Sequence, residues 1–156
     1  MNAFKSSKEI WAEAPEPRVK LNKYKNIATE QYKSKLEKTC ADMLELNNII
    51  FEYEPWEVVL IEPFTYELTS YERIGKVYKE QRHKLRKTSY KPDFIGDGWI
   101  IETKGKRTPD FQLKWKLFKR YLIENEYDGT LFMPTNRKEI IHSINVIKEL
   151  THGNSN

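Results

Sequence analysis

A chain of 156 residues that is 38% hydrophobic and 32% charged fits a single domain with one hydrophobic core. No apolar run is long enough to span a membrane, and residues 1–7 lack the apolar core of a signal peptide. A single cysteine excludes an internal disulfide framework and a multi-cysteine zinc site. We therefore expect a soluble, intracellular protein.

The net charge of +4 is distributed unevenly. Residues 73–91 contain eight Lys and Arg against one acid, and residues 104–120 contain seven against one. A basic run is usually only a solvated surface, but two such runs on either side of one acidic cluster favour a nucleic-acid partner. The candidate contacts are Lys76, Lys79, Arg82, Lys84, Arg86, Lys87, Lys106 and Arg107.

The chain begins with a polar segment, residues 1–28, that contains two closely spaced prolines and scattered basic residues. We interpret it as an extended or flexible arm, either a solvated tail, which the pattern favours, or a contact with DNA or a partner subunit. Residues 29–150 form the expected single domain, with a basic insertion at about 62–90. Residues 151–156 are expected to be a frayed tail.

The first predicted helix runs from Thr29, as its N-cap, to Asn47. Its apolar positions recur at helical spacing and include Cys40, which we interpret as a small buried hydrophobe. Glu37 lies at the edge of this apolar stripe. It is a candidate third metal ligand, although the pattern alone favours a surface partner for Lys33.

Residues 49–61 are rich in β-branched and aromatic residues, and Pro55 interrupts them. They predict either two short strands or one strand with a bulge. In the insertion that follows, Lys76–Lys87 fits a basic helix or a flap ordered by substrate, and the local pattern does not choose between them.

The central stretch is residues 90–105. Gly96-Asp97-Gly98 predicts a tight hairpin turn that folds the strand after Asp93 back against the strand that carries Glu102. Because strand side chains alternate between faces, Glu102 and Lys104 point the same way. Two carboxylates and one ammonium group should therefore converge.

Such a cluster is suited to a divalent metal. Carboxylate oxygens suit Mg²⁺, which shares its remaining positions with water and substrate phosphate. Lys104 could orient or help deprotonate the attacking water and offset charge on the phosphorus. The alternative is an exposed hairpin on which Glu102 and Lys104 only pair across solvent.

The remaining elements complete an α/β pattern. Thr108-Pro109-Asp110 is a strong helix start, residues 129–133 predict a strand, and residues 137–150 predict a final helix. The second helix should bury Phe111, Trp115, Phe118 and Leu122, and the last should bury Ile140, Ile141, Ile144 and Ile147. This order implies an α/β fold with a mixed sheet and helices packed on it.

Pro92-Asp93, Glu102-x-Lys104 and the upstream Glu37 together resemble the PD-(D/E)xK nuclease superfamily. The chain is most similar to its phage endonuclease I branch, the Holliday-junction resolvases. That likeness covers roughly residues 30–120 and rests on four motifs: YKSKLE at 32–37, FEYEPWEV at 51–58, PDF at 92–94 and IETKG at 101–105.

This resemblance implies a restriction-endonuclease-like core, with a mixed central β-sheet of about four strands flanked by helices. It also implies Mg²⁺-dependent cleavage of branched DNA, with Mn²⁺ able to substitute. Glu37, Asp93, Glu102 and the carbonyl of Thr103 match the family's metal ligands, and Lys104 matches its catalytic lysine. On this basis Glu37 becomes a site residue. The family acts as a homodimer, without a membrane or nucleotide cofactor, in the host cytoplasm when phage-encoded. The segment between Val58 and Pro92 is longer here than in the family.

Two alternatives remain open. The first is an endonuclease acting on flapped, nicked or ordinary duplex DNA, as in repair, restriction or transposon-end cleavage. The second is a DNA-binding module on the same fold without catalysis. The presence of Asp93, Glu102 and Lys104 together argues against that module.

Overall fold

The computed structural model describes residues 31–153, so the expected arm at 1–28 and residues 154–156 lie outside the described residues. The helices are α2 (Lys35–Leu46), α3 (Pro109–Glu124) and α4 (Arg137–Gly153). The strands are β1 (Glu52–Tyr53), β2 (Val58–Ile61), β3 (Phe64–Thr65), β4 (Ser70–Ile74), β5 (Val77–Gln81), β6 (Lys84–Leu85), β7 (Thr88–Tyr90), β8 (Phe94–Gly96), β9 (Trp99–Ile101) and β10 (Thr130–Phe132).

The central sheet has four strands in the order β1-β8-β9-β10. β8 pairs antiparallel with β1 and with β9, whereas β10 pairs parallel with β9. The turn between β8 and β9 uses Gly98 at a φ of 77°, a left-handed conformation that glycine adopts without strain. The expected mixed α/β domain with a four-stranded sheet and the expected hairpin are therefore confirmed.

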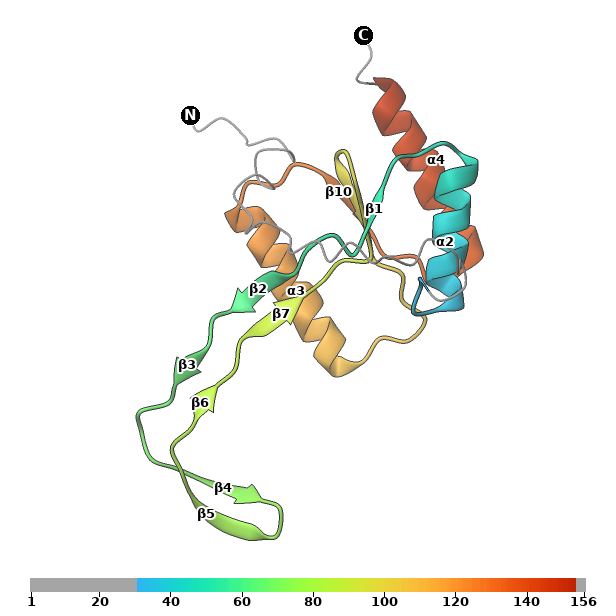
Figure 1. Ribbon diagram of the computed structural model, residues 1–156. Coiled ribbons are helices and arrows are strands. Elements are labelled where there is room, and N and C mark those ends of the chain that lie inside the picture. The colour runs from blue at the N-terminus through green and yellow to red at the C-terminus, as the bar shows by residue number, and fades with distance from the viewer. Residues whose placement is uncertain (1–30, 154–156) are drawn as a thin grey trace.

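Alternating side chains of β8 and β9 divide the core into two layers. Phe94, Trp99 and Ile101 pack with residues of α2 and α4, while Ile95 and Ile100 pack with residues of α3. The register explains this division, because Phe94 pairs with Ile101 and Ile95 pairs with Ile100, so each pair shares one face. Figure 1 shows α2 and α4 together, away from α3.

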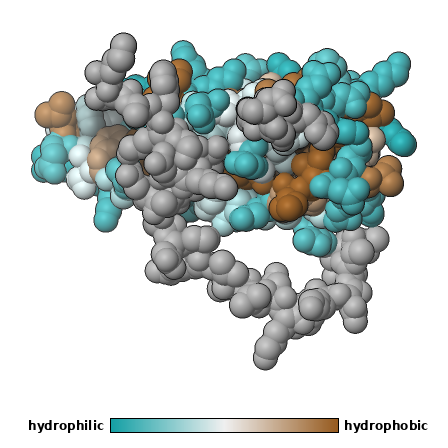
Figure 2. All heavy atoms as spheres, turned by 90° about the horizontal axis from the view of Figure 1, so that it is seen from above, coloured by the Kyte–Doolittle hydropathy of each residue, from teal (hydrophilic) through white to brown (hydrophobic). Residues whose placement is uncertain are grey.

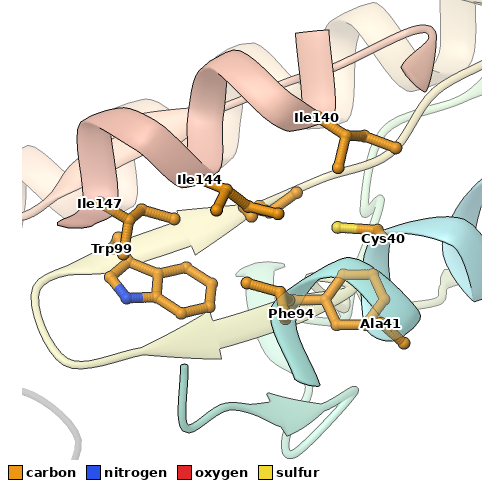
Figure 3. Close-up of a cluster of buried hydrophobic side chains, with 9 residues drawn as sticks. Cys40, Ala41, Phe94, Trp99, Ile140, Ile144 and Ile147 are labelled. Carbon is orange, nitrogen blue, oxygen red and sulfur yellow. The ribbon is translucent and has the colours of Figure 1, made fainter. Parts of the chain in front are cut away.

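The layer under α4 contains the largest buried side chains. Figure 3 shows Ile140, Ile144 and Ile147 projecting from α4 toward Trp99 and the neighbouring cluster, in which Cys40 is also fully buried. Full burial of each large apolar side chain contributes about 1.5–3 kcal/mol. This cluster therefore fixes the position of the β8–β9 hairpin.

Two helix starts are capped by hydroxyl groups. Thr108 caps α3 as expected, because its Oγ1 accepts the Phe111 N–H at 3.2 Å. Thr29 lies outside the described residues, but the predicted helix from Thr29 to Asn47 is wrong at residues 31–34, which are not helical. Instead Ser34 is its N-cap and accepts the Glu37 N–H at 3.1 Å. The cap satisfies an amide that has no partner inside the helix.

Pro55 separates two strands that join different sheets. β1 joins the central sheet, whereas β2 pairs with β7, β3 with β6 and β4 with β5. These three nested antiparallel pairs form one long hairpin, residues 58–90, which we call the ribbon (Figure 1). The alternative of a basic helix at Lys76–Lys87 is therefore wrong, since this segment is β5, a short connection and β6.

α4 differs from expectation in two respects. It continues through residues 151–153, which were assigned to a frayed tail. Ile141 is 39% exposed, whereas Ile140, Ile144 and Ile147 are buried as expected. Ile141 follows Ile140 by about 100° around the helix and therefore turns away from the sheet.

The surface of the described part is largely polar. Figure 2 shows teal, hydrophilic residues over much of the visible described surface, with hydrophobic residues in separate patches. Within residues 31–153, no helix combines the length and the apolar character that crossing a membrane requires.

We predict that Gly96→Ala destabilises the domain. A Cβ at this position would lie 2.1 Å from the indole ring of Trp99, which is itself fixed in the core. Such overpacking costs about 1–3 kcal/mol, measured as the free energy of unfolding in urea. Gly105→Ala is the matched control, because its Cβ would meet nothing within 4 Å. Equal stability of the two variants would contradict the close packing of Gly96 on Trp99.

Candidate active site

The β8–β9 hairpin brings Asp93 and Glu102 together, because they directly flank the paired residues Phe94 and Ile101. Although β9 ends at Ile101, backbone pairing continues beyond it. The Glu102 N–H donates to the Phe132 carbonyl at 2.9 Å, and the Lys104 N–H donates to the Pro134 carbonyl at 3.0 Å. Residues 102–104 are thus held in extended form by the end of β10 and the residues that follow it.

Asp93 is held in a fixed orientation by Thr103. Its Oδ2 accepts both the backbone N–H and the hydroxyl of Thr103, each at 2.8 Å. The side chain of Asp93 belongs to the buried set, with 9% of the residue exposed. Its other carboxylate oxygen has no hydrogen bond among the described residues and is left to bind a ligand.

Glu102 is held between Tyr90 and Lys104. The Tyr90 hydroxyl donates to Glu102 Oε2, and the Lys104 ammonium lies 3.8 Å from Oε1. Lys104 also lies over the ring of Phe111, with its Nζ 4.2 Å from the centroid. Glu102 and Lys104 therefore share one face, and the alternative of an exposed Glu–Lys pair is wrong because Glu102 is only 4% exposed.

Burial raises the pKa of both carboxyl groups. The pKa of Asp93 rises from 3.8 to about 6, mainly through desolvation, although its hydrogen bonds from Thr103 act in the opposite direction. The pKa of Glu102 rises from 4.5 to about 8, through desolvation and then the nearby charge of Asp93. Removing two carboxylates from water is unfavourable unless a cation compensates their charge.

Glu37 lies beside this pair on the first turn of α2. Its Oε2 accepts the Lys33 N–H at 2.9 Å and the Tyr53 hydroxyl at 2.6 Å. Because Glu37 is 8% exposed, its interpretation as a surface partner of the Lys33 side chain is wrong. The Lys33 ammonium instead pairs with Glu54.

Glu54 and Tyr90 are two residues of the site that sequence reasoning missed. The Glu54 side chain is 14% exposed, and Lys91 lies 3.7 Å from its Oε2. The Glu54 N–H donates to the Asp93 carbonyl at 2.8 Å, and its φ of 44° is left-handed, which is uncommon outside glycine. In the sequence, Glu54 could have been identified only by its position in the 51–58 motif, directly before Pro55.

One open cleft of about 350 Å³ joins these residues. Acids and lysines alternate in its lining, which includes Glu37, Glu54, Asp93, Glu102 and Asp110 together with Lys33, Lys91, Lys104 and Lys114. The predicted site residues Glu37, Asp93, Glu102, Thr103 and Lys104 all line it. Polymers can enter such an open cleft, whereas small ligands are usually enclosed more fully.

The oxygen donors in the cleft are suited to a Mg²⁺ ion that keeps part of its coordination for water and substrate, and not to an ion held by protein side chains alone. Within residues 31–153, no group of three or more His, Cys, Asp or Glu side chains is arranged to hold a metal ion. Mg²⁺, however, is usually bound by one or two carboxylates, with water and substrate phosphate completing its coordination. Asp93 and Glu102 provide two carboxylate donors, and Thr103, whose carbonyl is the predicted backbone ligand, also lines the cleft. Glu37 uses only Oε2 to accept from Tyr53 and the Lys33 N–H, so its Oε1 has no hydrogen bond among residues 31–153.

The predicted nucleic-acid contacts lie outside the cleft and are all exposed. Lys106 and Arg107 belong to the loop between Lys104 and α3, directly beside the site. The other six extend along the ribbon from Lys76 to Lys87. The predicted contacts therefore form two groups, one next to the site in the chain and one along the ribbon, whose β4–β5 end extends away from the body.

Comparison of this chain with protein-family models, curated proteins and solved structures finds no match.

Metal-free protein should lose stability as pH rises from about 4 to about 8. A carboxyl group whose folded pKa is raised binds more protons in the folded state, so its stabilising contribution is complete below its unfolded pKa and disappears as pH passes the folded pKa. In EDTA, we expect melting at pH 8.5 to occur roughly 5 °C below melting at pH 5.5. Saturating Mg²⁺ should recover much of that loss at pH 8.5.

Glu102→Gln tests the origin of this effect, because glutamine keeps the shape and cannot ionise. Its melting temperature should vary much less over the same pH range. Glu149→Gln is the control, since Glu149 is exposed on α4. A pH profile of Glu102→Gln that matches the parent protein would assign the dependence to other groups.

Tyr90→Phe should weaken metal binding while leaving the fold intact. The substitution removes only the hydroxyl that orients Glu102, and loss of such a supporting hydrogen bond typically costs about 10–100-fold in metal affinity. The measurement is Mg²⁺ titration followed by melting temperature at pH 8.5. Tyr78→Phe on the exposed ribbon is the control. Unchanged Mg²⁺ affinity in Tyr90→Phe would show that Tyr90 does not support the metal site.

Proposed function

We propose that this protein is a Mg²⁺-dependent endonuclease that hydrolyses phosphodiesters in branched DNA. The observation that carries the proposal is the burial of Asp93 and Glu102 side by side in an open cleft, with the Lys104 ammonium 3.8 Å from Glu102. A structural ion pair would not require a second buried carboxylate beside the first. A phosphodiester nuclease requires both acids and the cation.

Each side chain has a specific task under this proposal. Thr103 and Tyr90 fix Asp93 and Glu102, so that their free oxygens are oriented before substrate arrives. When bound there, Mg²⁺ supplies Lewis-acid stabilisation of negative charge on the phosphate oxygens. Lys104 orients the attacking water and offsets the charge that develops on the phosphate. The cation–π contact with the ring of Phe111 holds the Lys104 ammonium at the cleft.

The surroundings of the cleft favour a nucleic-acid substrate. Lys33, Lys91 and Lys114 line it together with Lys104. Lys106 and Arg107 are exposed next to it, so cations surround the two carboxylates. Phosphate groups on both sides of the scissile bond would meet these cations, which is the main source of affinity in DNA binding.

We further propose that the core is of the restriction-endonuclease type and belongs with the phage endonuclease I branch. A mixed sheet flanked by helices, with the acids on a central hairpin and Glu37 on the first described helix, supports this assignment. A homodimer is part of the proposal, because paired incisions across a four-way junction need two such clefts. The range of DNA structures cut depends on the spacing of those clefts.

Cleavage of matched four-way-junction, flap and linear duplex DNA tests the function. With Mg²⁺, the protein should cut the junction symmetrically, and EDTA should stop cutting. Lys104→Ala and Asp93→Asn should each lower the cleavage rate at least about 100-fold, because each removes a charge used in the transition state. Junction binding measured in EDTA should stay within a few-fold of the parent protein.

Lys119→Ala is the matched control, because it removes an exposed cation of α3 and should cut normally. Retained cutting by Lys104→Ala would remove lysine from the mechanism, and unchanged cutting by Asp93→Asn would refute the site. Equal cutting of all three DNAs would reduce the proposal to a general endonuclease. Binding of the junction by the parent protein without any cutting would indicate a DNA-binding module.

A further inference from the structure

The base of the ribbon packs on α3 through Val58 and Tyr90, whereas its β4–β5 end is exposed on both faces. All ten residues from 71 to 80 are exposed, including the apolar side chains of Tyr71, Ile74, Val77 and Tyr78. Its outer pairs extend away from the body in Figure 1. An isolated two-stranded hairpin is only marginally stable in water, so these exposed apolar and aromatic groups indicate a partner.

Positive charge is concentrated in the second half of the ribbon, because residues 58–72 contain three acids and no Lys or Arg. Residues 73–87 contain seven Lys and Arg against a single acid, Glu80. Among residues 31–153, Arg73, Lys76, Lys79, Lys84 and Arg86 form no ion pair; Arg82 reaches Glu80 only at 3.8 Å, and Lys87 pairs with Glu57. These cations are available to an external polyanion. Two ribbons facing each other would instead bring like charges together.

The basic surface is continuous with the candidate active site. Lys84, Arg86 and Lys87 line a hollow of about 480 Å³ at the base of the ribbon, together with Pro63 and Leu85. Further along the chain, Ser89 and Tyr90 of β7 and then Lys91 line the cleft that holds Asp93 and Glu102. The hollow and the cleft are therefore lined by residues only a few positions apart in the chain. A DNA backbone that extends out of the cleft would pass the hollow.

The dimensions of the ribbon match one groove of duplex DNA. Its two strands lie about 4.8 Å apart, and with side chains they fill the major groove, which is about 12 Å wide, but exceed the minor groove at about 6 Å. From Ile61 to Ile74 the strand path covers at most about 43 Å at 3.3 Å per residue. That reach corresponds to about one turn of duplex, or roughly 12 base pairs.

The end of the ribbon presents different chemistry on its two faces. The strand register places Ile74 opposite Val77 beside the Gly75-Lys76 turn, on one face. Tyr71 and Tyr78 contact each other on the other face, with ring centroids 6.1 Å apart, and Arg73 lies on the same side. Apolar groups can contact base edges and thymine methyl groups, while Arg73, Lys76 and Lys79 reach phosphates on both groove walls.

We propose that the ribbon is a duplex-binding arm, and that its β4–β5 end lies in the major groove of the DNA duplex next to the cut, within about one helical turn of Asp93 and Glu102. This inference rests on the proposed function in taking DNA as the polymer. It adds a second DNA-binding surface, so that affinity depends on the length of duplex beside the site.

The test compares DNA binding by the full chain on junctions whose arms are shorter or longer than the ribbon's reach, about 8 and about 16 base pairs. Dissociation constants are measured by fluorescence anisotropy in EDTA at several salt concentrations. The parent protein should bind the long-armed junction at least about tenfold more tightly. The triple variant Arg73→Gln, Lys76→Gln, Lys79→Gln should lose most of that preference.

The control is the triple variant Lys116→Gln, Lys119→Gln, Lys148→Gln, which removes three exposed cations from α3 and α4. It shows the effect of losing three charges that are not on the ribbon. This control should keep the preference for long arms. The ribbon variant should also flatten the slope of log affinity against log salt by up to about three, and Lys76→Gln alone by about one. All five ribbon and control lysines and Arg73 are exposed, so folding can be verified by an unchanged melting temperature.

Retention of the arm-length preference by the folded ribbon variant would overturn the inference. So would conversion of a dimer to a monomer, seen by sedimentation, with that preference unchanged, because the ribbon would then be a subunit contact. Cleavage of the same junctions by the parent protein in Mg²⁺ separates the two proposals. Length-dependent binding without cleavage refutes the nuclease and keeps the arm, whereas cleavage without any ribbon effect refutes only the arm.

Discussion

The pairing of β8 with β9 is the constraint on which the rest of the structure depends. Its register places Phe94 against Ile101, and so places the two carboxyl groups that flank this pair, Asp93 and Glu102, next to each other. Left alone, the buried acids would repel each other, and the charge of Asp93 raises the pKa of Glu102. The apolar layers on both faces of the hairpin hold them together against that repulsion. Packing energy therefore maintains an electrostatic arrangement that would not form in a free peptide.

The two layers have different consequences for the site. α2 and α4 cover one face through Phe94 and Trp99, and α2 also delivers Glu37 to the edge of the cleft. α3 covers the other face, and its first turn brings Phe111 beneath the Lys104 ammonium. α2 and α3 thus each contribute both to the core and to the position of a polar group, whereas α4 contributes to the core. Motion of either helix would alter the geometry around the acids, since a densely packed interior transmits displacement.

Features set by neighbouring residues were predictable from sequence, and features set by distant contacts were not. The hairpin, the Thr108 cap and the α3 stripe each depend on residues a few positions apart. The start of α2 was wrong because Thr29 and Ser34 are both good caps, and only the fold selects Ser34. Glu54 was missed because β1–β8 pairing brings it to Asp93. The ribbon was undecided because both of its faces are exposed, which removes the alternation that marks a half-buried strand.

The attachment of the ribbon has one further consequence. Its chain leaves the body at β2 and returns at the adjacent, paired β7, so the two points of attachment are neighbours in space. A segment inserted between such neighbours can lengthen, shorten or be replaced at small entropic cost, without altering the register of β8 with β9. Under the proposed function, substrate preference and bond cleavage are therefore separable in evolution. The ribbon can diverge among descendants of this chain while the hairpin and its chemistry are inherited unchanged.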